Sequence, residues 1–122
     1  MISRAIAIAI AIAIAATSGA AVAQPRDHGI MGNQQGNNFG ATLQCGEFQV
    51  GGGGGTITDL TLYRTGGFWI GRGTATSVWR TWPNNPQAAI GTVIPAGGPY
   101  YLCPDRPFAG AGDSSIHMTI NW

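Results

Sequence analysis

Charged and metal-binding residues are scarce in this sequence. Its 122 residues include no lysine, two histidines and two cysteines, and 9% of them are charged, compared with about 25% in an ordinary soluble domain. We therefore expect neither a basic nucleic-acid-binding surface nor an acidic disordered tail. No cluster of Cys and His residues has metal-ligand spacing, and we expect no metal and no cofactor.

Long apolar runs are confined to the N-terminus. Arg4 precedes an unbroken Ala/Ile run over residues 5–16, and Ala21-Val22-Ala23 fits a small-x-small cleavage site. This pattern is typical of a secretory signal peptide over residues 1–23, with cleavage after Ala23. The run is shorter than the roughly 18 apolar residues that a membrane anchor needs. We expect a secreted or periplasmic protein with no transmembrane segment after signal cleavage.

Removal of the signal peptide leaves a chain without net charge. Residues 24–122 carry five arginines and five acidic residues. A neutral chain rich in glycine lacks the self-repulsion that keeps proteins apart in solution. Such a chain is expected to bind a partner, to assemble with itself or to stay soluble through uncharged polar groups.

Both cysteines lie beyond the expected cleavage site. Cys45 and Cys103 are expected to form a disulfide, because an exported protein folds in an oxidising compartment. They lack the CxxC spacing of redox-active or metal-binding pairs, so we expect neither of those roles. The loop that this bond closes is long, and the chain-entropy model gives about 4 kcal/mol of stabilisation. The disulfide is predicted to join the first strand of the domain to a late one.

Residues 24–40 differ in composition from the rest. They are rich in Gly, Asn and Gln and show no periodic apolar face. This composition predicts a flexible N-terminal arm. An alternative is an arm that adds a strand to a neighbouring subunit.

From residue 41 onward, β-rich segments alternate with turns. We expect strands over residues 41–50, 56–64, 68–70, 74–82, 88–94, 99–103 and 113–122. Gly51 to Gly55 connects the first two strands, and Thr65-Gly66-Gly67 predicts a hairpin turn between the next two. Residues 41–122 are therefore predicted to form an all-β domain. We expect a small antiparallel β-sandwich of six or seven strands, immunoglobulin-like or similar, with one disulfide.

The final strand shows strict alternation of apolar and polar residues. Ile116, Met118, Ile120 and Trp122 share one phase, so we expect one buried face and one solvated face. Asp113, Ser115 and His117 occupy the other phase and include the residue types of a hydrolase triad. Alternate residues on a strand lie about 7 Å apart, whereas triad members need hydrogen-bond contact and an oxyanion hole. We therefore expect no enzymatic activity.

The region 60–104 combines aromatic side chains with arginines and contains no acidic residue. Trp and Tyr stack on sugar rings and anchor protein interfaces, where Arg is also enriched. The alternative is that the aromatic rings fill a small core and the arginines cover them by cation–π contact. The candidate residues for ligand or partner binding are Trp69, Arg72, Trp79, Arg80, Trp82, Tyr100 and Tyr101.

These observations favour a non-enzymatic structural or interaction protein, such as a subunit or accessory of a cell-surface or extracellular assembly. Its partner would be a second copy or another secreted protein, because scarce charge and β structure favour pairing of strand edges. One alternative is a carbohydrate-binding module that uses exposed Trp and Tyr side chains. Another is a small inhibitor of a secreted enzyme, with contacts from the stiff loop between Trp82 and Pro86.

Overall fold

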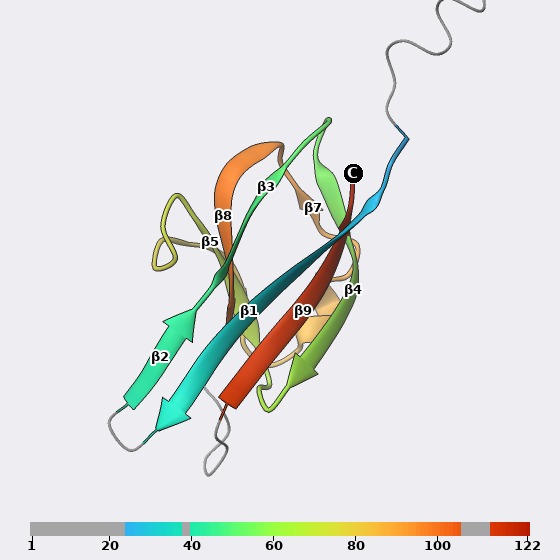
Figure 1. Cartoon of the computed structure of the whole chain (residues 1–122). Helices are drawn as coiled ribbons and strands as arrows, with labels where there is room; N and C mark the ends of the chain where they lie inside the picture. Colours follow the sequence, from blue (N-terminus) through green and yellow to red (C-terminus); the bar gives the residue numbers. More distant parts are fainter. Residues whose placement is uncertain (1–23, 38–39, 106–112) are drawn as a thin grey trace, which may run out of the picture.

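The chain folds as an antiparallel β-sandwich (Figure 1). The computed structural model describes residues 24–37, 40–105 and 113–122, and the expected signal peptide lies outside these ranges. Within them nine strands form two sheets. Sheet A has the strand order β2 (Gly40–Gln44), β1 (Asp27–Asn37), β9 (Asp113–Asn121), β4 (Gly55–Tyr63) and β7 (Val93–Ile94). Sheet B has the order β3 (Gly46–Val50), β8 (Gly97–Pro104), β5 (Phe68–Arg72) and β6 (Val78–Trp82).

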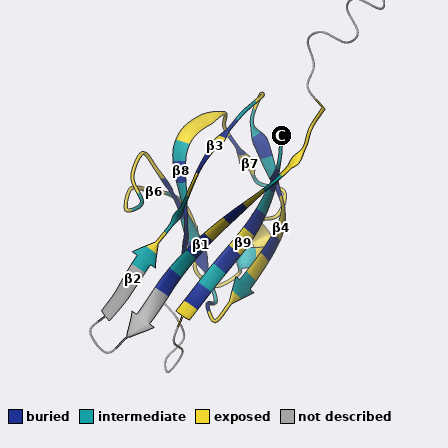
Figure 2. Ribbon diagram, viewed as in Figure 1, coloured by how far each residue is buried: buried dark blue, intermediate teal, exposed yellow. Residues whose placement is uncertain are grey.

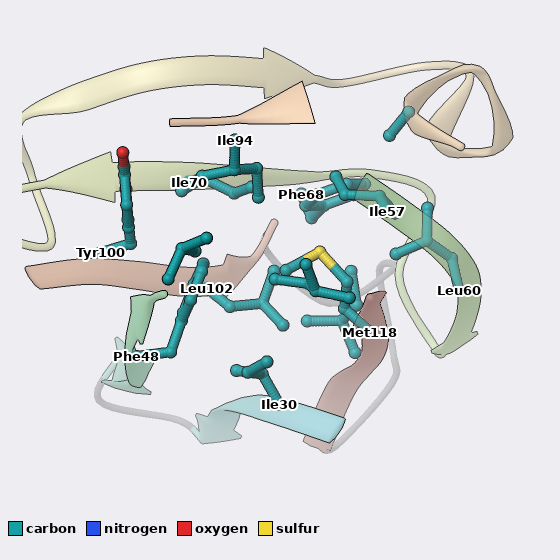
Figure 3. Close-up of a cluster of buried hydrophobic side chains, with 14 residues drawn as sticks. Ile30, Phe48, Ile57, Leu60, Phe68, Ile70, Ile94, Tyr100, Leu102 and Met118 are labelled. Atoms are coloured by element: carbon teal, nitrogen blue, oxygen red, sulfur yellow. The ribbon is translucent and has the colours of Figure 1, made fainter. Parts of the chain in front are cut away.

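The core lies between the two sheets (Figure 3). Sheet A contributes fully buried side chains from β4 and β9, and sheet B contributes them from β5 and β8. Burial of these apolar side chains is the dominant stabilising term, at roughly 25 cal/mol per Å² removed from water. The fully buried large side chains include Ile57, Phe68, Ile70, Tyr100, Leu102, Ile116, Met118 and Ile120.

The alternation predicted for the last strand is confirmed. In β9 the apolar residues Ile116, Met118 and Ile120 are fully buried, whereas Asp113 and His117 are exposed. Figure 2 shows this change of burial along β9. The polar phase of β9 therefore lies on the outer face of sheet A.

The expected disulfide is also confirmed. Cys45, at the junction of β2 and β3, is bonded to Cys103 in β8. The bond thus joins the β2–β3 junction to a late strand across 58 positions of the sequence, whereas the first strand of the domain is β1. Such a disulfide fits an extracellular or periplasmic location.

The segment expected to be a flexible arm differs most from its prediction. Residues 27–37 form β1, which lies inside sheet A between β2 and β9. Its register with β9 runs from Asp27 opposite Asn121 to Gln35 opposite Asp113. This segment is ordered by backbone pairing with β9, a strand that lies far away in the sequence. In addition, Ile30 is buried against the core. A local reading of composition could not detect that partner.

The expected hairpin between the strands flanking Thr65-Gly66-Gly67 is wrong. β4 belongs to sheet A and β5 to sheet B, so this connection crosses between the sheets. Arg64 adopts a φ of 56°, and the Thr65 hydroxyl donates a hydrogen bond to the Gly67 carbonyl at 3.0 Å. A Gly-Gly pair suits a crossing as well as a hairpin, because it accepts either sign of φ.

Three further strand boundaries differ from expectation. The segment 41–50 divides at Cys45 into β2 and β3, which belong to different sheets. The segment 74–82 is a strand only from Val78 onward. The segment 88–94 contains the end of a 3-10 helix, η1 (Pro86–Ala89), and the two-residue strand β7. Within the described residues, β1 and the division of one expected strand therefore raise the number of strands from seven to nine.

Candidate functional site

The seven candidate residues all lie in sheet B, on the adjacent strands β8, β5 and β6. They do not share one face of that sheet. Trp69 alternates with the fully buried Phe68 and Ile70, and Tyr101 alternates with the fully buried Tyr100 and Leu102. Because successive side chains of a strand point to opposite faces, Trp69 and Tyr101 face outward while Tyr100 faces the core.

The two outward aromatic residues are held by hydrogen bonds. The indole Nε1 of Trp69 donates to the Ala75 carbonyl at 2.8 Å, so the loop before β6 folds back over this ring. The Tyr101 hydroxyl donates to Glu47 Oε1 at 2.9 Å. Glu47 lies directly opposite Tyr101 on the neighbouring strand β3.

The Glu47→Gln substitution is expected to lower the pKa of Tyr101. This pKa is raised above its ordinary value of 10.0 by the hydrogen bond to Glu47, with burial and the charge of Glu47 acting in the same direction. The fold therefore gains stability at a pH below the ordinary tyrosine pKa, and this contribution is lost as the pH rises through the raised value. Tyrosinate absorbance measures the pKa, and subtracting the curve of Tyr101→Phe isolates Tyr101. An unchanged curve for Glu47→Gln would contradict this explanation.

Four of the candidate residues form a continuous row, which we call the arginine–aromatic row: Arg72, Tyr100, Trp79 and Arg80. The Arg72 guanidinium carbon lies 5.4 Å from the centre of the Tyr100 ring. The Tyr100 and Trp79 rings are 5.8 Å apart at an angle of 55°. The Arg80 guanidinium carbon lies 5.1 Å from the Trp79 ring. Two cations thus flank two aromatic rings that touch each other.

A β-bulge places Trp79 in this row. Ile70 is opposite Arg80 and Gly71 is opposite Val78, so Trp79 is an extra residue on β6 without a direct partner. A bulge re-aims the side chain of the extra residue. Here it brings the Trp79 ring against Tyr100, which is fully buried and donates its hydroxyl to the Pro95 carbonyl at 2.8 Å.

The aromatic side chains of this region also serve the core. Trp79 and Trp82 are partly buried against it, and the Trp82 ring stacks on Phe68 at 4.8 Å. The alternative raised by the sequence, rings in the core with arginines covering them, thus describes the Arg72–Tyr100 and Arg80–Trp79 contacts. A ligand at this surface would meet the exposed arginines and the rims of two tryptophans.

Val78 is a further exposed residue of this region that is not among the seven candidates. This residue begins β6 and its side chain is 55% exposed. In the part of the chain that the structure describes, β6 has β5 on one side and no strand on the other. A β-branched residue in a strand indicates β structure but not an edge position, so nothing in the sequence pointed to it.

The other residues considered in the sequence lie outside the arginine–aromatic row. Asp113, Ser115 and His117 lie in one phase of β9 on the outer face of sheet A. The proline-bounded residues 83–85 form an exposed connection between β6 and η1. In the described ranges no three His, Cys, Asp or Glu side chains gather into a metal-binding group. The same ranges contain no helix that is long and apolar enough to span a membrane.

Comparison with known proteins assigns no relative to this chain. No protein-family model, no curated protein and no solved structure matches it.

Proposed function

We propose that this chain is an exported, non-catalytic interaction protein that binds an extended segment of another secreted or surface protein along the free edge of β6. It would act as a subunit or accessory of an extracellular or cell-surface assembly. The observation that carries the proposal is the location of the arginine–aromatic row beside an edge of β6 with which no other described strand pairs. The signal peptide and cleavage after Ala23 are part of this proposal.

The backbone of β6 supports this binding mode. An edge strand presents N–H and C=O groups to which a further strand can be added. Beyond the bulge, β6 pairs regularly with β5 from Arg80 to Trp82, so its free side is an extended backbone. Short length and bulges are the ways in which edge strands are usually protected. The edge strand β7 has two residues, whereas β3 and β6 each have five residues and one irregularity. The side chains beside the edge, rather than its backbone, therefore favour β6 over β3.

The side chains around β6 favour a partner segment that carries carboxylates. Arg72 and Arg80 are exposed, and β5, β6 and β8 contain no acidic residue. Basic groups at an interface attract and orient an acidic partner. The half-buried Trp79 and Trp82 supply apolar contact area of the kind found at the centre of protein interfaces.

Two-fold pairing of β6 with a second β6 is less favourable. Arg80 is the central residue of this five-residue strand. An antiparallel pair centred there would place two arginines directly opposite each other, which is destabilising. The geometry therefore favours a different protein over a second copy.

We expect the disulfide-bonded protein to bind a synthetic peptide of the sequence Thr-Glu-Val-Glu-Val-Glu-Thr. Binding is measured by fluorescence anisotropy, and the site is located by hydrogen–deuterium exchange, which should slow at the amides of β6. The same peptide with Lys in place of Glu should not bind. The same acidic peptide N-methylated at each of its five central residues tests whether the backbone is used: it keeps the charge but has no N–H donor at these residues on either edge.

A matched pair of charge reversals locates the interaction. Arg80→Glu is expected to weaken binding of the acidic peptide about tenfold, because it places like charges across the new strand pair. Arg64→Glu is the control, since Arg64 makes a similar cation–π contact with Tyr63 at 5.0 Å but directly follows β4 of the other sheet. Equal effects of the two substitutions, or undiminished binding of the N-methylated peptide, would show that charge alone attracts the peptide.

A further inference from the structure

A polar hollow lies on the outer face of sheet A, on a different sheet from β6. Its volume is about 350 Å³, which is at the lower end of the range of small-molecule clefts, roughly 300–1,000 Å³. Four strands that lie side by side, β2, β1, β9 and β4, contribute to it (Figure 1). Its lining residues are Asn33, Gln44, Tyr63, Asp113, Ser114 and Ser115.

Strand register explains why a hollow forms here. Gln44 pairs with Asn33, Asn33 with Ser115, and Ser115 with Tyr63, so these residues form one straight row across the sheet. Neighbouring strands are about 4.8 Å apart, and the ends of the row are therefore about 14 Å apart. The shorter side chains, Asn33 and Ser115, occupy the middle, between the longer Gln44 and Tyr63. The row is consequently raised at its ends and low at its centre.

The chemistry of the lining is that of a site for hydroxyl groups. The amides of Asn33 and Gln44 each offer a donor and an acceptor, and the Ser115 hydroxyl offers both as well. Asp113 lies two residues before Ser115 in the same phase of β9 and adds a carboxylate, which accepts hydrogen bonds when ionised. These groups together can bind adjacent hydroxyls of one ligand as donors and as acceptors.

Tyr63 adds an aromatic surface at one end of the row. Its side chain is 54% exposed, and the Arg64 guanidinium lies 5.0 Å from the ring centre. A cation over an aromatic face stabilises that arrangement, so Arg64 limits the freedom of the ring. An exposed ring of this kind offers an apolar face on which the C–H face of a sugar ring can pack.

We infer that this hollow binds a neutral saccharide of one or two sugar rings. A saccharide combines an apolar ring face with a rim of hydroxyls, which matches one aromatic side chain beside two amides, a hydroxyl and a carboxylate. An anionic ligand would be repelled by Asp113, and a wholly apolar ligand would leave these polar groups without partners. The inference uses none of the residues of the β6 edge and is independent of the proposed function.

The test uses the disulfide-bonded protein and two-dimensional amide NMR. The probes are glucose, galactose, mannose, N-acetylglucosamine, cellobiose, lactose and chitobiose, each titrated into the millimolar range. We expect at least one of them to shift the amide signals of Asn33 and Ser115. Tyr63→Ala is expected to weaken this binding about tenfold or more, because it removes the stacking surface. Asp113→Asn is expected to weaken it less, because an amide retains one acceptor.

The control is Tyr101→Ala, which removes a partly exposed aromatic side chain from the other sheet and should leave the affinity unchanged. All variants are compared by their amide spectra, which report whether the fold is retained. Three results would overturn the inference: no probe shifts these signals, the shifts map to another surface, or Tyr63→Ala binds as tightly as the natural chain.

Discussion

Replacing Gly32 by Ala is expected to lower the free energy of unfolding by about 3 kcal/mol. A Cβ atom at this position would collide with the carbonyl oxygen of Leu102 and would lie 3.3 Å from the Pro104 side chain. Gly32 lies in β1 of sheet A, whereas Leu102 lies in β8 of sheet B. The collision is thus with the backbone of the opposite sheet, and the two sheets must move apart to relieve it.

Gly53→Ala is the matched control. Gly53 has open space around the position of a Cβ atom, so its replacement should leave stability unchanged or slightly raised. Chemical denaturation of both variants, with fluorescence and circular dichroism as probes, gives the two free energies. Equal stability of Gly32→Ala and the natural chain would show that β1 does not approach β8 this closely in solution.

Removal of the disulfide is expected to have the largest effect on stability. Cys45→Ala with Cys103→Ala should lower the free energy of unfolding by about 4 kcal/mol, because a bond that spans so much of the chain restricts the unfolded state strongly. Small domains are typically stable by about 5–15 kcal/mol, so this loss is a large share of the total. Urea unfolding at equilibrium measures it.

Reduction of the natural chain separates the contribution of the S–S bond to stability from the contribution of the packed sulfur atoms. Cys103 is fully buried, and the reduced protein keeps both sulfur atoms while losing the bond between them. We expect the reduced chain and the double variant to be destabilised by similar amounts. A reduced chain as stable as the oxidised one would contradict the assigned role of the bond.

The segment 24–40 shows where composition misleads. Its Gly, Asn and Gln residues do not form an apolar stripe, and a local reading therefore predicts disorder. In the structure, Ile30 and the backbone at Gly32 face the core, and the strand is ordered by its register with β9. Deletion of this segment would remove β1, an interior strand of sheet A. Such a deletion would disturb the fold itself, so partner binding is better tested by substitutions at the β6 edge.

The aromatic region was located by sequence, but its arrangement was not. All seven candidate residues fall in β5, β6 and β8. The bulge at Trp79 and the cross-strand contact between Arg72 and Tyr100 decide which of them touch. The polar row from Gln44 to Tyr63 was not foreseen, because its members come from four strands and are adjacent only through register.

The sequence alone determined the all-β class, the disulfide and the buried face of the last strand. These features depend on properties that are local or chemical: alternation at period two, turn residues between apolar runs, and two cysteines in an expected exported chain. Tertiary structure decided which strands pair, which edge stays free and which side chains meet across a sheet. Asp27 is opposite Asn121 and Cys45 is bonded to Cys103, and contacts between residues so distant in sequence are set by the packing of the whole domain.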